Sequence, residues 1–179
     1  MAESESALTD KKEANHPPED LPRHVSSAHS SLLCELVEGL SEELGQALLS
    51  VVLFGSVARG MANVGSDIDI LVVFDENSVK RKTVRDTFIA VRSGLSKAPP
   101  PFVSSVVLSY SEAKATPYVF LDIAQDGIVL LDPQHVFCRM RCKVLDRLKQ
   151  LGAQRVYLED GTWYWNLKPD AKLNEPIKI

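Results

Sequence analysis

The chain has 179 residues, of which 45% are hydrophobic and 25% charged, and its formal net charge is −4. This length suits one domain with short appendages and allows a sizeable core. The acidic balance gives no overall positive field for nucleic acid or an anionic membrane, and no apolar run approaches the roughly 18 residues of a membrane span. Three cysteines without framework spacing, and an N-terminus without an apolar leader segment, predict a cytoplasmic protein.

The first third of the chain divides into a polar tail, a helix and a strand. Residues 1–26 are charged and poor in branched apolar side chains, which predicts a disordered tail. Residues 27–47 are predicted to be helical, because one apolar stripe recurs at three- and four-residue steps. The stripe consists of Leu33, Leu36, Val37, Leu40, Leu44 and Leu48. A continuous branched run at 48–54 then indicates a buried strand.

The middle of the chain alternates between strands and helices. Further strands are predicted at 67–74, 102–109 and 127–132. Residues 78–96 form an amphipathic pattern with apolar residues on one face and basic residues on the other. Ser109 and Glu112 have the spacing of a capping box, which predicts another helix after the third strand.

The C-terminal part is expected to form a helix and a hairpin. Asp132 and Pro133 resemble an N-cap followed by proline at the first helical position, and Gly152 would end that helix. Residues 155–170 predict a hairpin that turns at Asp160–Gly161. Its second strand would carry Trp163 and Trp165 on one face and Tyr164 on the other. This aromatic face could pack against the last helix or form an exposed docking surface.

Together these elements predict a small α/β (α+β) domain. The expected organisation is a disordered tail at 1–26, a core at 27–132, and a C-terminal helix and aromatic hairpin at 133–179 packed on that core.

Two carboxylates stand where the second strand begins. In a strand, side chains two residues apart share a face and lie roughly 6.6 Å apart along the backbone. Asp67 and Asp69 could therefore bind the same cation or pair of cations. Hard carboxylate oxygens with no His or Cys beside them in the sequence favour Mg²⁺ or Mn²⁺ over zinc. A solvated strand end is the alternative for an isolated Asp-x-Asp.

A glycine and a serine precede these carboxylates. Gly55 directly follows the first strand and lets the backbone come close to a ligand, while Ser56 offers a hydroxyl and an N–H. If the next residues open a short helix, its N-terminal amides would attract phosphate. A phosphate site beside a metal site is what a magnesium–nucleotide complex requires.

The segments GSVARG and SDIDILV, which contain these residues, resemble the minimal nucleotidyltransferases (MNT type) of the DNA polymerase β-like superfamily. The resemblance covers roughly residues 27–132. It implies the polymerase β-like nucleotidyltransferase fold, a small mixed sheet flanked by helices.

By this resemblance the site residues fall into two groups. Asp67 and Asp69 correspond to the catalytic pair that ligates divalent metal, Mg²⁺ or Mn²⁺, and Gly55 and Ser56 to the residues that hold the nucleoside triphosphate, ATP or another NTP. Ser66, at the start of the second motif, is also expected at the nucleotide. Arg59 corresponds to the arginine of the family's ARG segment, and either a phosphate contact or a salt bridge to a neighbouring carboxylate could explain it.

The sequence departs from the family on the third strand. The family commonly has an acidic residue near its start, where this chain has Ser104 and Ser105. Neither can act as a base at neutral pH, and one lost general base typically costs about 10²–10⁴-fold in rate. Glu112 and Asp122 are the alternative acids, although capping and a solvent-facing helix position explain them more simply.

Two functions are therefore expected. The first is a nucleotidyltransferase that transfers a nucleoside monophosphate, AMP by preference, to a hydroxyl of a protein or small molecule. The second is a catalytically weak MNT-type antitoxin that binds and neutralises a HEPN-type toxin partner. A tRNA-like acceptor is a weaker alternative, and the sequence does not define the oligomeric state.

Two features of the predicted last helix remain outside this assignment. Cys138 and Cys142 lie one helical turn apart, with His135 before them, and favour ordinary packing over a metal site. A run of basic residues favours a solvated face over a partner-binding surface. The run comprises Arg139, Arg141, Lys143, Arg147 and Lys149.

Overall fold

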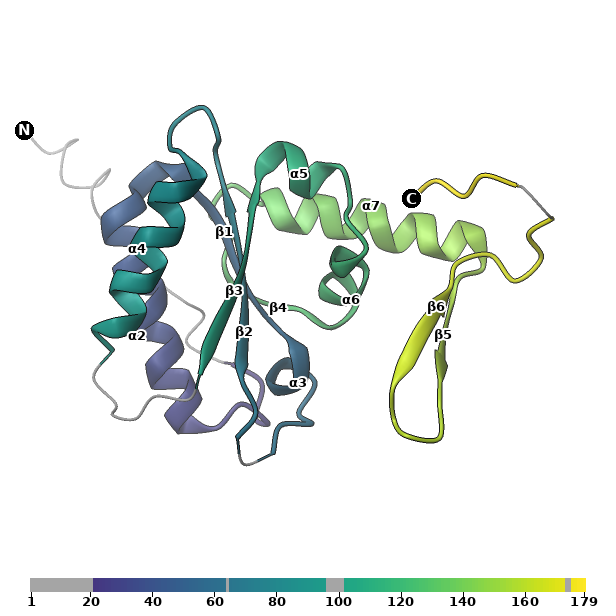
Figure 1. The fold of residues 1–179 in the computed structure, drawn as a ribbon, viewed down its shortest axis with the longest axis horizontal. Coiled ribbons are helices and arrows are strands. Elements are labelled where there is room, and N and C mark those ends of the chain that lie inside the picture. Colours follow the sequence, from purple (N-terminus) through teal and green to yellow (C-terminus); the bar gives the residue numbers. More distant parts are fainter. Residues whose placement is uncertain (1–20, 64, 96–101, 173–174) are drawn as a thin grey trace, which may run out of the picture.

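The computed structural model describes residues 21–63, 65–95, 102–172 and 175–179. A four-stranded sheet with the order β3-β2-β1-β4 lies at the centre of the domain (Figure 1). The strands are β1 (Leu48–Phe54), β2 (Ile68–Phe74), β3 (Val103–Ser109) and β4 (Ile128–Leu131). β2 and β3 run parallel, whereas β1 is antiparallel to both β2 and β4, so the sheet is mixed.

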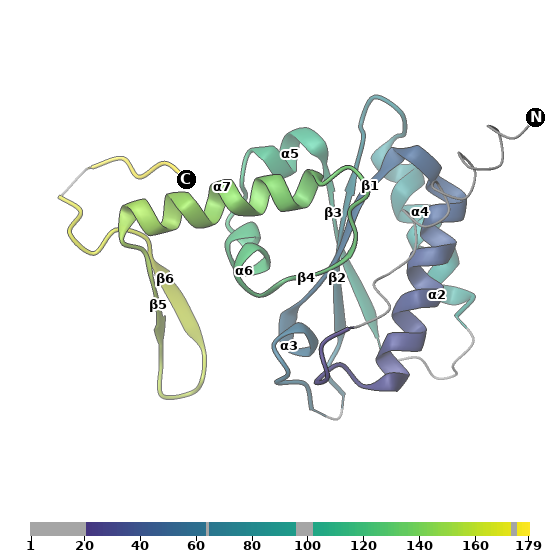
Figure 2. The same ribbon diagram turned by 180° about the vertical axis from the view of Figure 1, so that it is seen from behind.

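Helices cover both faces of this sheet. Figure 2, seen from behind, shows the same two layers as Figure 1, with α2 and α4 on one face and α5, α6 and α7 on the other. The helices are α2 (Ser27–Leu44), α4 (Arg81–Ser93), α5 (Tyr110–Lys114), α6 (Val119–Asp126) and α7 (Val136–Leu151). A 3-10 turn, η1 (Gly45–Ala47), leads into β1, and the short helix α3 (Gly55–Ala58) follows it. A separate hairpin of β5 (Gln154–Tyr157) and β6 (Trp163–Asn166) lies beyond the end of α7.

The alternation of side chains along the strands builds one core on each face of the sheet. Val51 of β1 and Ile70 of β2 face α2 and α4, whereas Val52 and Leu71 face α6 and α7. Since β1 and β2 are buried on both faces, they are continuous apolar runs, apart from Ser50 and Asp69. The predicted fold class is thereby confirmed.

Most predicted elements occur with small shifts at their ends. The four predicted strands and the amphipathic helix before β3 are all present. The capping box is also confirmed: Ser109 accepts from the Glu112 N–H, and the Glu112 carboxylate accepts from the Ser109 N–H. The hairpin pairs as expected, with Val156 opposite Tyr164, and Gly161 has a φ of +81° in its turn.

Two boundaries differ from the sequence prediction. Residues 1–20 of the predicted tail lie outside the described residues, but residues 21–26 belong to the folded domain. Val25 is buried with the α2 core, and His24 Nε2 lies 2.9 Å from the carbonyl oxygen of Ala58. A few well-placed apolar and polar side chains thus anchor a segment whose composition alone predicts disorder.

The last helix begins at Val136, not directly after Asp132 and Pro133. A turn intervenes, in which the His135 N–H donates to the Asp132 carbonyl oxygen. Asp132 still caps the helix, because its carboxylate accepts from the N–H groups of Phe137 and Cys138. The capping residue was therefore identified correctly, but the helix begins later than predicted.

Two further observations concern membrane-spanning helices and cysteines. Among the described residues, no helix is long and apolar enough to cross a membrane. All three cysteines, Cys34, Cys138 and Cys142, are free thiols.

Two neighbouring residues of α4 allow a matched test of the core. Phe88 is 2% exposed and packs in the α2/α4 core, whereas Ile89 is 51% exposed. Phe88→Ala should lower the free energy of unfolding by about 3–5 kcal/mol, because it removes buried surface and leaves a cavity. Ile89→Ala should change it by less than about 0.5 kcal/mol. Urea unfolding followed by circular dichroism measures both; equal losses would contradict this packing.

Candidate active site at the end of the first strand

The site begins with a close contact between Gly55 and the carboxylate of Asp69. Phe54, the last residue of β1, pairs with Asp69 of β2, and the chain then turns into α3. Gly55 has a φ of +76°, and a Cβ built on it would lie 2.1 Å from Asp69 Oδ2. Any other residue at this position would therefore displace the carboxylate. The glycine allows the backbone of the turn and the Asp69 carboxylate to occupy one small space.

The third strand places a serine beside the same carboxylate. Ser104 is opposite Asp69 in the parallel β2–β3 pair, and its hydroxyl donates to Asp69 Oδ1 at 2.7 Å. Of the two serines considered from the sequence, the structure therefore brings Ser104 to Asp69, while Ser105 is exposed. The hydrogen bond orients Asp69 and leaves its Oδ2 facing Gly55.

The two alternative acids are engaged elsewhere. Glu112 completes the capping box of α5 and forms an ion pair with Arg81. Asp122 accepts hydrogen bonds from Arg155 and from both tryptophan indoles. Neither replaces the missing carboxylate at Ser104 in this conformation.

The remaining predicted site residues lie around this contact. Asp67 is exposed and directly precedes β2, two residues before Asp69. Ser56 is half-buried in the first turn of α3, and its carbonyl oxygen accepts from the Met61 N–H. Ser66 is held within the loop, since its hydroxyl donates to Asn63 Oδ1 and accepts from the Asn63 N–H.

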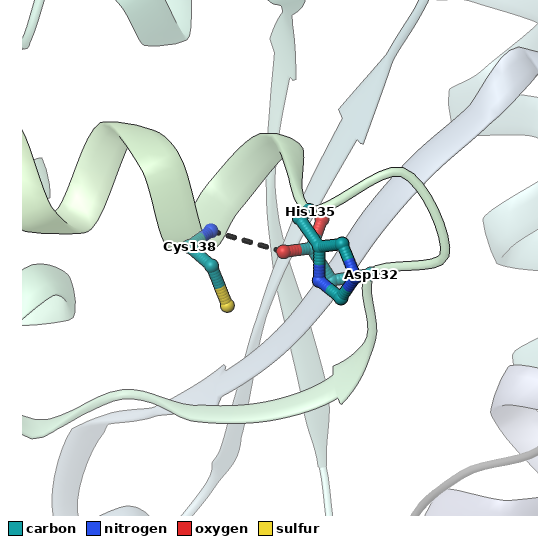
Figure 3. Close-up of side chains that lie close together, drawn as sticks. All are labelled: Asp132, His135 and Cys138. Atoms are coloured by element: carbon teal, nitrogen blue, oxygen red, sulfur yellow. Dashed lines mark hydrogen bonds between the residues drawn. The ribbon is translucent and has the colours of Figure 1, made fainter.

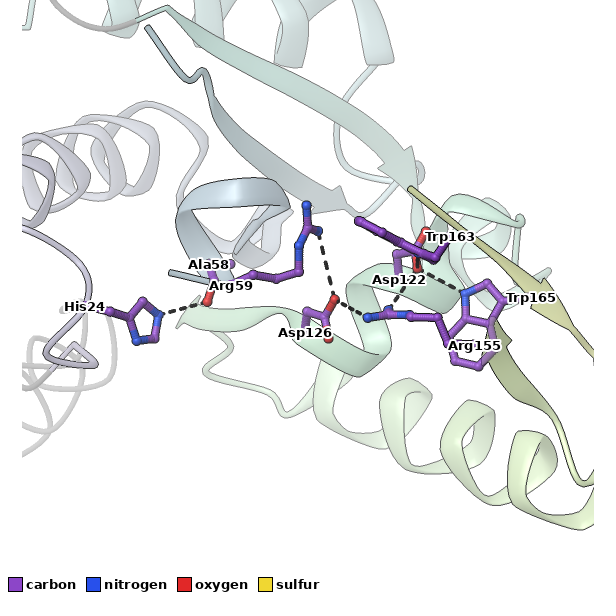
Figure 4. Close-up of polar contacts among 8 residues, drawn as sticks. All are labelled: His24, Ala58, Arg59, Asp122, Asp126, Arg155, Trp163 and Trp165. Atoms are coloured by element: carbon purple, nitrogen blue, oxygen red, sulfur yellow. Dashed lines mark hydrogen bonds and ion pairs between the residues drawn. The ribbon is translucent and has the colours of Figure 1, made fainter. Parts of the chain in front are cut away.

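Arg59 directly follows α3 and points toward α6 and the hairpin (Figure 4). Its Nη1 lies 3.9 Å from Asp126 Oδ2, and its guanidinium carbon lies 4.5 Å from the centre of the Trp163 ring. The salt-bridge alternative considered for this arginine is thus present in the structure. A phosphate contact remains a prediction.

A cluster of charged and aromatic side chains docks the hairpin on α6. Arg155 of β5 donates to Asp122 at 2.9 Å and to Asp126 at 2.8 Å (Figure 4). The indole nitrogens of Trp163 and Trp165 both donate to Asp122 Oδ1 at 3.0 Å. The tryptophans therefore share one face as predicted, but that face turns to α6.

The surroundings of Arg155 in this cluster stabilise its positive charge. Burial by itself would lower the pKa of the guanidinium, but the hydrogen bonds that it donates to Tyr157 and Asp126, and the charges of Asp126 and Asp122, outweigh burial and raise the pKa. The cation contacts the rings of Trp163 and Trp165, each about 5.1 Å from its centre. Asp126 links this cluster to Arg59 and hence to the turn at Gly55.

The residues of this cluster are visible in the sequence, but their contacts with one another are not. Asp122 was considered as an alternative acid, and Trp163 and Trp165 were predicted to share one face of the hairpin. Half-buried indoles need a hydrogen-bond acceptor, which is the signal that could have connected them. Because Asp122 and Trp165 are 43 residues apart, local pattern alone did not pair them.

The donors at the Gly55–Asp69 contact suit a hard cation. They are carboxylate oxygens and hydroxyls, which Mg²⁺ prefers to nitrogen or sulfur ligands. One oxygen of Asp69 is held by Ser104 and the other lies at a glycine with no side chain to cover it. The residues present therefore fit a magnesium ion.

Comparison with known proteins identifies the family. A sequence model of the nucleotidyltransferase domain matches residues 33–122, about half of the chain, and this chain therefore belongs to that family. The match includes the Gly55–Ser56 turn and both Asp67 and Asp69. The predicted relationship to nucleotidyltransferases is confirmed.

Individual relatives are more distant. "Putative protein adenylyltransferase MJ1305" of Methanocaldococcus jannaschii is 39% identical over 56 residues, which are 31% of this chain and only 37% of that protein. A crystal structure of a toxin–antitoxin with AMP-PNP has 17% identity and a TM-score of 0.43, covering 66% of this chain and 88% of that one. The toxin–antitoxin MntA-HepT has 15% identity and a TM-score of 0.44, covering 68% and 88%. These structural similarities are too distant to bear on the chemistry of the site.

The docking cluster can be tested through the only two tryptophans of the chain. Asp122→Ala removes the shared acceptor of both indoles, so the tryptophan fluorescence should shift to longer wavelength. The free energy of unfolding should fall by about 1–3 kcal/mol, since partly buried donors lose their partner. Asp146→Ala, at an exposed position of α7, is the control and should change neither quantity. An unchanged spectrum in Asp122→Ala would contradict the docked hairpin.

Proposed function

We propose that this protein transfers a nucleoside monophosphate, AMP from ATP by preference, to a hydroxyl of a protein or small-molecule acceptor. The observation that carries the proposal is the contact of Gly55 with Asp69, because it joins a turn suited to phosphate and a carboxylate suited to Mg²⁺ in one site. The nucleotidyltransferase family and the adenylyltransferase name of one relative support the reaction class. The three free thiols agree with the cytoplasmic location expected from the sequence.

Each predicted site residue has a distinct task in this proposal. Gly55 lets the triphosphate approach the backbone, and Ser56 donates to it from its hydroxyl and N–H. Asp67 and Asp69 hold divalent metal, which would neutralise phosphate charge and lower the pKa of the acceptor hydroxyl. Ser66 and Arg59 are proposed to border the nucleotide, Arg59 after release from Asp126.

The proposed transfer balances as a simple displacement. The acceptor oxygen forms a bond to the α-phosphorus while the bond from that phosphorus to the bridging oxygen of the β-phosphate breaks. Pyrophosphate leaves, and the acceptor proton passes to solvent or to a carboxylate. Ser104 cannot take that proton at neutral pH, so we expect slow turnover.

The serine at this position favours a second candidate function. A site that binds Mg-ATP but transfers slowly would suit an MNT-type antitoxin that neutralises a HEPN-type toxin mainly by contact. The two candidates differ in one result. Transfer of label from ATP labelled at its α-phosphate to the product of the neighbouring gene, lost in the double variant Asp67→Ala/Asp69→Ala, supports the enzyme. If the wild type and the double variant neutralise the toxin equally, and the toxin carries no label, the result supports the antitoxin.

Restoring the missing acid gives a gain-of-function test. Ser104→Asp places a carboxylate beside Asp69, so label transfer at saturating Mg²⁺ should rise by about 10²–10⁴-fold. Without Mg²⁺ the same variant should be less stable, because two carboxylates then repel each other. Ser105→Asp, at the exposed neighbouring position, is the matched control and should leave the rate unchanged. A rate unaffected by Ser104→Asp would argue against slow transfer through a missing base.

The glycine contact gives a binding test. Gly55→Ala should weaken Mg-ATP binding at least about tenfold, a loss of about 1.4 kcal/mol, because the new methyl overlaps Asp69. Gly65→Ala is the control for backbone strain alone, since Gly65 has a φ of +97° and no neighbour within 4 Å of the added Cβ. Isothermal titration calorimetry measures both variants. Equal affinity in Gly55→Ala and the wild type would remove the basis of the proposed nucleotide site.

A further inference from the structure

Three side chains of different chemistry meet where β4 leads into α7. They are Asp132, His135 and Cys138, called here the Asp132 cluster (Figure 3). One ligand atom from each residue lies within 4.8 Å of the other two. Among the described residues, this is the only group of three or more His, Cys, Asp or Glu side chains that converge in this way.

The carboxylate of Asp132 is held firmly by the protein. Oδ1 accepts from the Ser50 hydroxyl at 2.7 Å and from the Phe137 N–H at 3.1 Å. Oδ2 accepts from the Cys138 N–H at 2.9 Å. With two lone pairs on each oxygen, these three bonds leave one acceptor position, on Oδ2. The carboxylate is thus oriented in advance, and the remaining acceptor position is open to the Cys138 thiol or to a metal.

The backbone holds His135 beside it in an uncommon conformation. His135 has a φ of +52° and a ψ of +34°, the left-handed region that few residues other than glycine adopt. The turn that fixes it uses the bond from the His135 N–H to the Asp132 carbonyl oxygen. Its imidazole is exposed and lies over the Asp132 carboxylate in Figure 3. This geometry gives the ring access both to the cluster and to solvent.

Cys138 contributes a half-buried thiol. Burial, followed by the hydrogen bond to Asp132 and its negative charge, raises the pKa of this thiol. A metal would displace the proton and take the thiolate as a ligand.

We propose that the Asp132 cluster binds Zn²⁺ through one carboxylate oxygen, one imidazole nitrogen and one thiolate sulfur. Zinc accepts all three donor types in tetrahedral geometry, whereas Mg²⁺ takes oxygen ligands almost exclusively. Three protein ligands leave the fourth position to water. The bound ion would tie the start of α7 to β1 through Asp132 and Ser50.

The zinc site is separate from the candidate active site. Asp132 bonds to Ser50 near the start of β1, whereas Asp69 is paired with Phe54 at the end of that strand. Four residues of strand span roughly 13 Å. The two sites therefore lie at opposite ends of β1 and can be measured independently.

The test uses the full chain, freed of metal with a chelator and titrated with Co²⁺ as a spectroscopic probe and with Zn²⁺ by calorimetry. One equivalent of Co²⁺ should give a thiolate-to-cobalt charge-transfer band and the visible bands of tetrahedral cobalt, and Zn²⁺ should abolish both. No nucleotide is present, so the result does not depend on the proposed transfer reaction.

Two ligand variants and one control locate the ion. Cys138→Ser should remove the charge-transfer band and weaken Zn²⁺ binding at least about 100-fold, because loss of a supporting contact alone costs 10–100-fold. His135→Asn should weaken binding similarly, and asparagine tolerates the left-handed backbone, so the fold should be retained. Cys142→Ser, an exposed cysteine one turn along α7, should bind as tightly as the wild type.

Three results would overturn the proposal. The first is absence of the band in the wild type. The second is its retention in Cys138→Ser, and the third is equal loss in Cys142→Ser. Circular dichroism of each variant shows whether a lost signal reflects lost ligands or lost structure. If Cys138→Ser unfolds, the Zn²⁺ affinity of His135→Asn alone decides whether the cluster binds the ion.

Discussion

The contact between Gly55 and the Asp69 carboxylate is the constraint on which the candidate active site depends. A Cβ at residue 55 would lie 2.1 Å from Asp69 Oδ2, so a side chain and this carboxylate cannot both occupy the space. The contact requires Phe54 to pair with Asp69, which brings the end of β1 and the start of β2 to one edge of the sheet. The turn, its serine and both carboxylates share that edge because the strands are antiparallel.

Ser104 changes the charge balance at this edge. Its hydroxyl satisfies Asp69 Oδ1 with a neutral donor, so the site keeps Asp69 oriented even without a cation. An acid at this position would instead repel Asp69 until a cation arrived. Ser104 therefore orders the Asp69 carboxylate before any cation binds. In exchange, the site lacks the carboxylate that could act as the general base. A serine at residue 104 favours stability of the site without a cation, whereas an acid there would favour rapid proton removal.

The sequence predicted the elements well because their signals are local. Continuous branched runs identified β1 and β2, and the Ser109–Glu112 spacing identified the capping box. The Asp122 interactions were missed because they join residues 33 to 43 positions apart, where no periodicity operates. The surroundings of Asp132 were hidden for another reason. Asp132 was correctly assigned as a cap, and only the folded structure shows that His135 and Cys138 converge on its carboxylate.

The hairpin contacts the residue that follows the Gly55 turn helix, although it lies outside the matched family segment, which ends at residue 122. Trp163 contacts Arg59, which directly follows α3, and Asp126 lies between Arg59 and Arg155. To contact phosphate, Arg59 would have to break its contacts with both Asp126 and the Trp163 ring. In the proposed function, two weak interactions, an ion pair of 3.9 Å and a cation–π contact of about 0.5–2 kcal/mol, would be exchanged for a stronger bond to phosphate. Under that proposal, docking of the hairpin and nucleotide binding at the turn would be coupled through Arg59.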